Sequence, residues 1–451
     1  MRARPAPGLV VCVVGGGAAG ILAAVALARH PSRTARRIVV VEPRPELGTG
    51  VAYGTRSPSH LLNVRAAGMS ALPDVPADFV ARCRAHGITD DPAAFVPRHH
   101  YPAYLRATLA DAVVAADGRV TVEHVPVRAL GVRMGAGGRL RIETDDGGAI
   151  AADRLLLATG HGQPGSGWPD DPRVIADPWS ADVLATIGRE ARVTIVGSGL
   201  TAVDVVLALD DAGHRGPVRL LSRHGLLPMA HAAGPALPRP PATGPDDPSA
   251  ATVLGILRAL RVDAAIADDP RATADALRPA TVALWRGLGD TERRRFLRHA
   301  LRHWETVRHR MAPEVATRID GLRAAGRLRV ERGRVVDLAA GPDGVVVTVS
   351  MSGRVGEHIA GVVIRATGPS PDPHDDPLLA RLIAEGSARP HPLGIGLDVE
   401  PDGRIRRADG SAWATVRALG SLRKGAEWEC TAVPELRLHA RDAAAAILGD
   451  A

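Results

Sequence analysis

The chain has 451 residues, of which 45% are hydrophobic, and a formal net charge of +7 at pH 7. This length allows two or three domains with large cores, and the apolar content excludes a largely disordered chain. The arginines are scattered without a long basic run, so we expect no nucleic-acid partner. No stretch reaches the roughly 20 apolar residues of a membrane span, and the three cysteines form no CxxC pair. We therefore expect a cytoplasmic protein with no membrane partner and no metal site.

The first predicted elements form a dinucleotide-binding βαβ unit. A β-branched strand at 10–14 leads into GGGAAG, which has GxGxxG spacing, then into an apolar helix and a second strand, RIVVVE. In such a unit the glycines permit a tight turn and close approach of a pyrophosphate to the helix N-terminus, and the final acid accepts ribose hydroxyls. The pattern predicts an adenine dinucleotide, with an unliganded βαβ unit as the alternative. The residues expected at this site are Gly15, Gly17, Ala18, Ala19, Gly20 and Glu42.

A second copy of the pattern begins in mid-chain with RVTIVGSGLTAVDVVLAL. A strand again runs into a glycine turn and a helix, but the next strand, Val218–Leu221, ends in a Ser-Arg pair where the first copy has an acid. A guanidinium at a strand end suits the 2′-phosphate of NADP, and a surface arginine in a loop is the alternative. The residues expected at this site are Gly197, Gly199, Leu200, Thr201, Ala202, Ser222 and Arg223.

Two strands that end in Ala-Thr-Gly, LLLATG and VVIRATG, are expected to carry the chain between the two units. We therefore predict an α/β fold with two Rossmann-like dinucleotide-binding domains, the second inserted in the first. The FAD-binding domain comprises residues 1–165 and 369–451, and the NADPH-binding domain comprises 166–368. FAD is assigned to the first site because a flavin is retained over many turnovers, whereas a nicotinamide exchanges. Further expected cofactor contacts are Val127, Ala158, Thr159, Gly160, Thr367 and Gly368.

A helical insertion is predicted at about 228–313. Its apolar positions Leu297, Leu301 and Trp304 fall at i, i+4 and i+7, which is one face of a helix. One interpretation is a cap packed on the NADPH domain. The other is a cap that covers the flavin and shapes the substrate pocket. Its candidate polar contributors are His231, His309 and Arg310.

The string LGTGVAYGTRSPSHLLNVRAAGMSALPD, with GHGQP, SRHGLLP, RHRMAP, PLGIGLDV and WECTAVPELR, resembles the bacterial FAD/NAD(P)-binding oxidoreductase family. That family is one of the two-dinucleotide-binding-domain flavoproteins, related to flavin-dependent amine N-hydroxylases and flavin-containing monooxygenases. The resemblance covers nearly the whole chain and implies FAD and a nicotinamide, but it fixes no substrate. The chain lacks the FxGxxxHxxxW and FxGxxxHxxxP strings of neighbouring monooxygenase groups and the CxxC of disulfide reductases.

The resemblance also implies which segments lie near the flavin. Asn63 would hydrogen-bond the isoalloxazine edge or a flavin peroxide, unless it only caps a turn. A C-terminal helix, expected to begin near Thr431, would point its positive end at the flavin N1–C2=O edge. Trp428 and Glu429 line the substrate pocket or are structural. The expected contacts are Gly50, Val51, Asn63, Gly420, Thr431 and Ala432, with Tyr53 and Asn63 as the catalytic candidates.

The implied activity is that of an NADPH-dependent flavin monooxygenase in specialised metabolism, such as natural product biosynthesis. Hydride would pass from NADPH to FAD, and a flavin C4a-hydroperoxide would transfer oxygen from O2 to an amine, amino-acid or indole-type substrate, free or peptide-carried. One alternative is an NADPH–flavin dehydrogenase or reductase without oxygen insertion. A second alternative is a flavin-bound non-catalytic partner protein. Such a protein would not need two complete dinucleotide-binding motifs. The sequence leaves the oligomeric state open.

Overall fold

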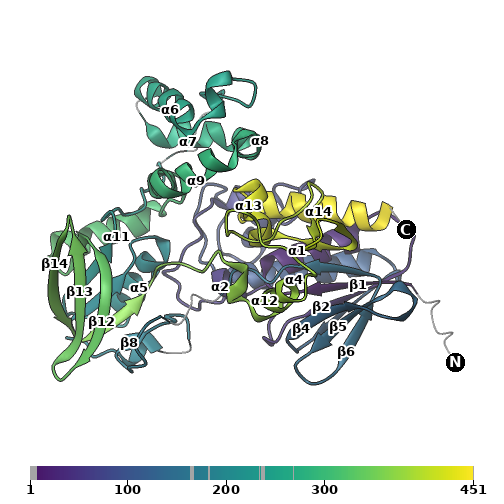
Figure 1. The fold of residues 1–451 in the computed structure, drawn as a ribbon, viewed down its shortest axis with the longest axis horizontal. Coiled ribbons are helices and arrows are strands. Elements are labelled where there is room, and N and C mark those ends of the chain that lie inside the picture. Colours follow the sequence, from purple (N-terminus) through teal and green to yellow (C-terminus); the bar gives the residue numbers. More distant parts are fainter. Residues whose placement is uncertain are drawn as a thin grey trace.

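The computed structural model describes residues 8–162, 167–180, 183–232, 234, 239–267 and 269–449. Two largely parallel sheets form the centres of two α/β units, and each unit carries a small antiparallel sheet. A group of helices, α6 to α9, stands beyond both sheets (Figure 1). The predicted α/β fold with two Rossmann-like units and a helical insertion is confirmed.

The first sheet has six strands in the order β16-β17-β7-β1-β2-β3. All neighbours run parallel except β16, which pairs antiparallel with β17 at the edge. Residues from both ends of the chain therefore share one sheet. Its strands are β1 (Leu9–Val14), β2 (Arg36–Val41), β3 (Val120–Val125), β7 (Arg154–Leu157), β16 (Arg404–Arg406) and β17 (Ala412–Ala418). The antiparallel strands beside it are β4 (Ala129–Met134), β5 (Leu140–Thr144) and β6 (Ala149–Ala152).

The second sheet has five parallel strands in the order β11-β10-β9-β15-β8. They are β8 (Val174–Ile175), β9 (Val193–Val196), β10 (Val218–Ser222), β11 (Leu328–Arg332) and β15 (Val362–Arg365). The antiparallel sheet of this unit contains β12 (Arg334–Gly341), β13 (Gly344–Met351) and β14 (Arg354–Ala360). Sheet membership supports the domain limits that we propose, although residues 165 and 166 at the first boundary lie outside the described residues.

The helices fall into three groups. The first unit contains α1 (Ala18–Arg29), α2 (Gly50–Tyr53), α3 (Asp78–Ala85), α4 (His100–Ala115), α12 (Pro377–Ala384), α13 (Lys424–Glu427) and α14 (Val433–Gly449). The second contains α5 (Leu200–Asp211) and α11 (Pro313–Ala324). The insertion contains α6 (Val253–Ala267), α7 (Pro270–Leu277), α8 (Thr281–Gly287), α9 (Asp290–His299) and α10 (Leu301–Arg308). None of the helices in the described part of the chain is both long and apolar enough to cross a membrane.

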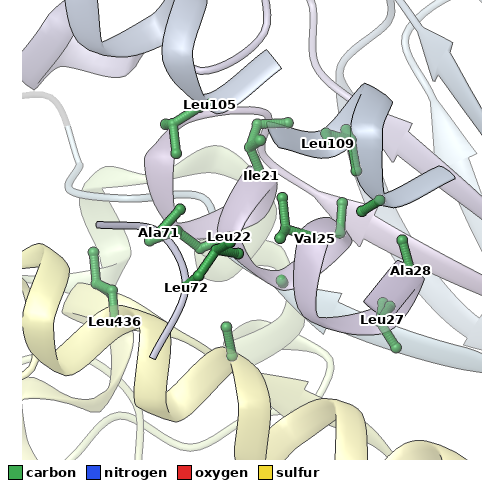
Figure 2. Close-up of a cluster of buried hydrophobic side chains, with 14 of the residues drawn as sticks. Ile21, Leu22, Val25, Leu27, Ala28, Ala71, Leu72, Leu105, Leu109 and Leu436 are labelled. Atoms are coloured by element: carbon green, nitrogen blue, oxygen red, sulfur yellow. The ribbon is translucent and has the colours of Figure 1, made fainter. Parts of the chain in front are cut away.

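Helix α1 is the centre of the larger core, because it is apolar around most of its circumference. Ile21 and Leu22 are at most 1% exposed and pack against Leu105 of α4 and Leu436 of α14 (Figure 2). The C-terminal helix therefore fixes α1, and with it the glycine turn at the start of α1.

The single helical face predicted across residues 297–304 is wrong in detail. The chain bends at Ala300, whose backbone angles are φ −107° and ψ −27°, and α9 ends there while α10 begins. Ala300 is buried, and the bend lets Leu297 and Leu301 pack on one apolar cluster while Trp304 packs on another. Leu297 and Leu301 therefore do not share one packing surface with Trp304.

The two units are joined by a partly buried ion pair. Asp204 of α5 accepts a hydrogen bond from Arg98 Nη1 at 2.6 Å, and the two side chains are 7% and 17% exposed. His60 Nε2 lies 2.9 Å from the backbone oxygen of Asp204. Loops of the first unit therefore hold the helix that follows the second glycine turn.

Arg36 is a buried arginine that completes the C-terminal end of α1. It is 4% exposed, and its guanidinium donates five hydrogen bonds to backbone oxygens. The last helical carbonyls have no partner within a helix, and a cation there also opposes the negative end of the helix dipole. The acceptors belong to Leu27, Ala28, His30, Ser32 and Thr34.

Replacing Arg36 by methionine should destabilise the first unit by about 3 kcal/mol, because it leaves buried carbonyl oxygens without donors. Urea unfolding followed by circular dichroism measures this loss. The control is Arg37→Met, which breaks only an exposed pair with Glu123 and should cost less than about 1 kcal/mol. Equal losses in the two variants would contradict the capping role of Arg36.

Candidate functional site

The first glycine turn is shaped by close backbone contacts. Gly15 has φ +103°, and a Cβ atom there would lie 2.2 Å from the backbone oxygen of Ala158. A Cβ at Gly20 would lie 1.8 Å from the oxygen of Gly15. Both contacts are impossible for any larger residue, so these glycines bring β1, α1 and the end of β7 together. Gly17 caps α1 with extended backbone, and Ala18 and Ala19 form the first turn of the helix.

Glu42 lies beside this turn at the carboxyl end of β2. It is 3% exposed, and its Oε2 accepts a hydrogen bond from Gly16 N at 2.8 Å while Arg44 Nε donates to Oε1 at 2.8 Å. Burial raises the pKa of Glu42, but the bonds from Arg44 and Gly16 outweigh it and the net pKa is lowered. The carboxylate is thus ionised at neutral pH and can accept further hydroxyl donors. Val127 follows the end of β3, whose Val125 oxygen accepts from Glu42 N at 3.2 Å.

Three chain segments meet at the end of β7. Ser421 Oγ donates to the backbone oxygen of Gly160 at 2.6 Å. A Cβ at Gly420, which has φ +66°, would lie 3.6 Å from the Cβ of Ala19. The Oγ1 atom of Thr159 is buried without a hydrogen-bond partner in the described part of the chain. A buried hydroxyl is normally paired, so this orphan fits a site that receives a polar ligand.

The two catalytic candidates occupy different surroundings. Tyr53 packs on Tyr101 with ring centroids 4.8 Å apart, and burial raises the pKa of its phenol to about 12. The phenol is therefore protonated at neutral pH and is no base. Asn63 lies in an irregular stretch, where its backbone oxygen accepts from His231 Nε2 at 3.0 Å. Their catalytic roles stay predictions.

The remaining predicted flavin contacts lie in two short segments. Gly50 begins α2, and its Cα atom lies 3.6 Å from a Cβ built on Gly17. Val51 is 62% exposed on the same helix. Thr431 and Ala432 directly precede α14, which begins at Val433 with Pro434 in its first turn, close to the predicted start.

The second glycine turn repeats the geometry of the first. Gly197 has φ +124°, and a Cβ there would lie 2.1 Å from the backbone oxygen of Ala366. Gly199 caps α5 with extended backbone, whereas Ala202 is fully buried beneath the turn and helps to pack the helix. The turn opens on a cavity of about 570 Å³. The predicted residues that line it are Gly197, Gly199, Leu200, Thr201, Ser222, Arg223, Thr367 and Gly368.

Residues of the insertion, Glu305 among them, reach this cavity. Arg302 of α10 donates from Nη2 to the backbone oxygens of Ser198 at 3.0 Å and Leu226 at 2.6 Å. Sequence reasoning missed Arg302, because nothing local marks one arginine among many in a helical segment. His309 also lines the cavity, and burial lowers its pKa to about 4 although Glu429 opposes that shift, so the ring is neutral near pH 7.

The other polar candidates of the insertion, Arg310 and His231, do not line this cavity. Arg310 is 3% exposed and forms a two-pronged pair with Asp275, each contact 2.9 Å long. His231 packs on Phe95 with ring centroids 4.8 Å apart. Burial lowers the pKa of His231 to about 4, so its ring is also neutral near pH 7.

The insertion is bonded to both units, which corrects the interpretation of a cap on the second unit alone. Trp285 Nε1 donates to the backbone oxygen of Gly425 at 2.8 Å, and Trp304 Nε1 donates to Glu429 Oε1 at 3.2 Å. Arg302 supplies the contact with the second unit. The insertion therefore bridges the second glycine turn and the segment that leads into α14. Glu429 is buried beneath it.

Two Rossmann-like units are thus joined in one chain, with a helical insertion across them. Residues 12–162 match the family described as FAD-NAD(P)-binding, which confirms the predicted dinucleotide-binding domain there. Comparison with curated protein sequences gave no match.

Among solved structures, the chain is similar to the ornithine N-hydroxylase of Kutzneria sp. 744, with a TM-score of 0.68 and 18% identity over 98% of this chain and 99% of that one. It is similar to the L-lysine 6-monooxygenase of Pseudomonas syringae, with a TM-score of 0.65 and 18% identity over 98% and 99% of the two chains. It is also similar to the bacillithiol disulfide reductase of Bacillus cereus, with a TM-score of 0.55 and 14% identity over 98% of this chain and 99% of that one. At these identities the likeness establishes the fold.

Replacing Glu42 by glutamine should weaken FAD binding about ten-fold, because a charge-assisted acceptor becomes a neutral one. Titration of the apoprotein with FAD, followed by flavin fluorescence, measures the Kd. Glu46→Gln is the control, since the Glu46 side chain is 65% exposed. An unchanged Kd in the Glu42 variant would remove Glu42 from the site.

Replacing Arg223 by alanine should raise the Kd of NADPH about ten-fold or more and leave that of NADH within about two-fold, because only NADPH carries a 2′-phosphate. Isothermal titration with both nucleotides measures the difference. Arg219→Ala is the matched control, since Arg219 pairs with Glu331 on the neighbouring strand. Equal losses for both nucleotides would show that Arg223 does not read the 2′-phosphate.

Proposed function

We propose that the chain is an FAD- and NADPH-dependent monooxygenase that oxygenates an amine, amino-acid or indole-type substrate. The observation that carries the proposal is the repeated glycine turn, once beside a buried carboxylate and once on a cavity with a basic strand end. The similar ornithine N-hydroxylase structure from Kutzneria is described as holding reduced FAD, NADP⁺ and L-ornithine. The same arrangement of sites in this chain would serve two nucleotides in one reaction.

The first site would hold FAD through four features. They are the Gly15 turn, the Glu42 carboxylate, the unpartnered Thr159 hydroxyl and the close approach at Gly420. When bound, FAD supplies the redox chemistry that links a nicotinamide to oxygen. Helix α14 has 17 residues, and its N-terminus would stabilise negative charge placed near it.

The second site would hold NADPH in the cavity of about 570 Å³. Arg223 is exposed at its edge, where a guanidinium can bind a 2′-phosphate. Arg302 fixes the backbone of Ser198 beside the glycine turn. His309 would present a neutral ring to the nucleotide, because burial lowers its pKa to about 4.

A disulfide reductase is the less favoured assignment. Cys12, Cys83 and Cys430 are free and buried, and burial raises the pKa of each thiol. A redox dithiol needs an accessible thiolate beside a second cysteine. Buried free thiols also support the cytoplasm as the proposed compartment.

The first experiment is anaerobic reduction of the FAD-loaded protein by NADPH and by NADH, followed by an oxygen pulse. We expect NADPH to reduce the flavin about ten-fold faster. After oxygen, we expect a transient spectrum that differs from those of reduced and oxidised flavin. Direct return to oxidised flavin with one hydrogen peroxide per flavin, for every amine, amino acid and indole tested, would favour the simple reductase. No reduction by either nucleotide would overturn the two-cofactor proposal.

A further inference from the structure

Helices α6 to α10 and Trp428 line a second cavity, of about 490 Å³, which is open to solvent on one side. Protein interiors leave few voids larger than a water molecule, whereas small-molecule sites measure roughly 300–1,000 Å³. The wall is mostly aliphatic and aromatic and includes Ile256, Leu257 and Leu284. A mostly apolar cavity of this volume has the dimensions of a small-molecule site.

Aromatic side chains are concentrated at this cavity. The whole chain has only 3 Phe and 6 Trp, yet Trp285, Phe296, Trp304 and Trp428 all line it. The Trp428 ring lies 5.0 Å from Trp285 and 5.2 Å from Phe296, measured between centroids. Rings at these distances and angles form a wall that favours stacking or edge contact with another aromatic ring.

Charge at the cavity argues against an alkylammonium ligand. None of the described residues that line it is acidic, and its ionisable groups are Arg261, His299 and His303. These three side chains belong to exposed residues, which leaves the interior apolar. A protonated amine such as that of ornithine or lysine would be buried there without a counter-charge, and that burial is costly.

Trp428 is held at the cavity by a strained turn. Its backbone has φ +62° and ψ −66°, and Glu429 N donates to Glu427 O at 2.8 Å, which makes a γ-turn of the rare, strained kind. Lys424 Nζ lies 4.7 Å from the centroid of the Trp428 ring. The turn directs an aromatic side chain to the cavity just before Thr431 and Ala432, which are predicted flavin contacts.

We propose that this cavity binds the aromatic ring of the substrate, so that the substrate is an indole-sized aromatic compound and not ornithine or lysine. The proposal rests on the proposed function for the reaction that follows binding. The binding step itself depends only on the cavity.

Equilibrium dialysis of the FAD-loaded protein with indole and with L-ornithine, without NADPH, tests the proposal. We expect saturable binding of indole and none of ornithine. Leu257→Trp fills the cavity and should weaken indole binding roughly ten-fold or more. Leu254→Trp is the matched control, because Leu254 lies on the same helix, is 49% exposed and should leave the Kd within about two-fold. Ala264→Leu fills less space and should give a smaller loss, with FAD content reporting that each variant is folded.

The outcomes separate this proposal from the proposed function. Saturable ornithine binding without indole binding would overturn the aromatic class. Indole binding that survives Leu257→Trp would place the ligand elsewhere. Normal flavin reduction by NADPH without saturable indole binding would overturn only the cavity assignment. Indole binding that is lost in Leu257→Trp, with no flavin reduction by either nucleotide, would overturn only the monooxygenase.

Discussion

The close approach of a glycine turn to the carbonyl end of a neighbouring strand is the constraint on which both units depend. The Cβ positions of Gly15 and Gly197 would lie 2.2 Å and 2.1 Å from the oxygens of Ala158 and Ala366. The strand orders β17-β7-β1-β2-β3 and β8-β15-β9-β10-β11 place these contacts at equivalent points. Carboxyl ends of parallel strands share an edge, so each sheet gathers its glycine turn, its helix N-terminus and an Ala-Thr-Gly segment there.

The two copies differ where their ligands would differ. Glu42 ends the second strand of the first unit, buried and bonded to Gly16, whereas Ser222 and the exposed Arg223 end the corresponding strand of the second. One edge therefore presents a carboxylate to hydroxyl donors, and the other presents a guanidinium to an anion. The two units share one backbone arrangement. They can suit ligand groups of opposite character because the side chains just after the strand ends differ between them.

The parts predicted from the sequence are those fixed by local pattern. Strand, glycine turn, helix and terminal side chain follow one another within a short span, and the C-terminal helix is marked by Pro434 and its apolar spacing. The contacts that were missed join distant residues: Arg302 bonds Ser198 across 104 positions, and Trp285 bonds Gly425 across 140. Neither pairing leaves a local signal, because each arises only when the insertion folds across both units. The break between α9 and α10 at Ala300 was missed for the same reason. The residues on its two sides pack on two clusters whose members are distant in the sequence.

Helix α10 and its flanking residues line both cavities, and the helical repeat decides which residues face each one. Arg302, Glu305 and His309 line the cavity at the second glycine turn, and their spacing of three and four places them on one face. Ala300, His303, Trp304 and Val307 line the apolar cavity from the other face. A displacement of α10 would therefore move a wall of each cavity. Ligands that favour different positions of α10 would therefore change each other's affinity by the same factor, as linkage requires.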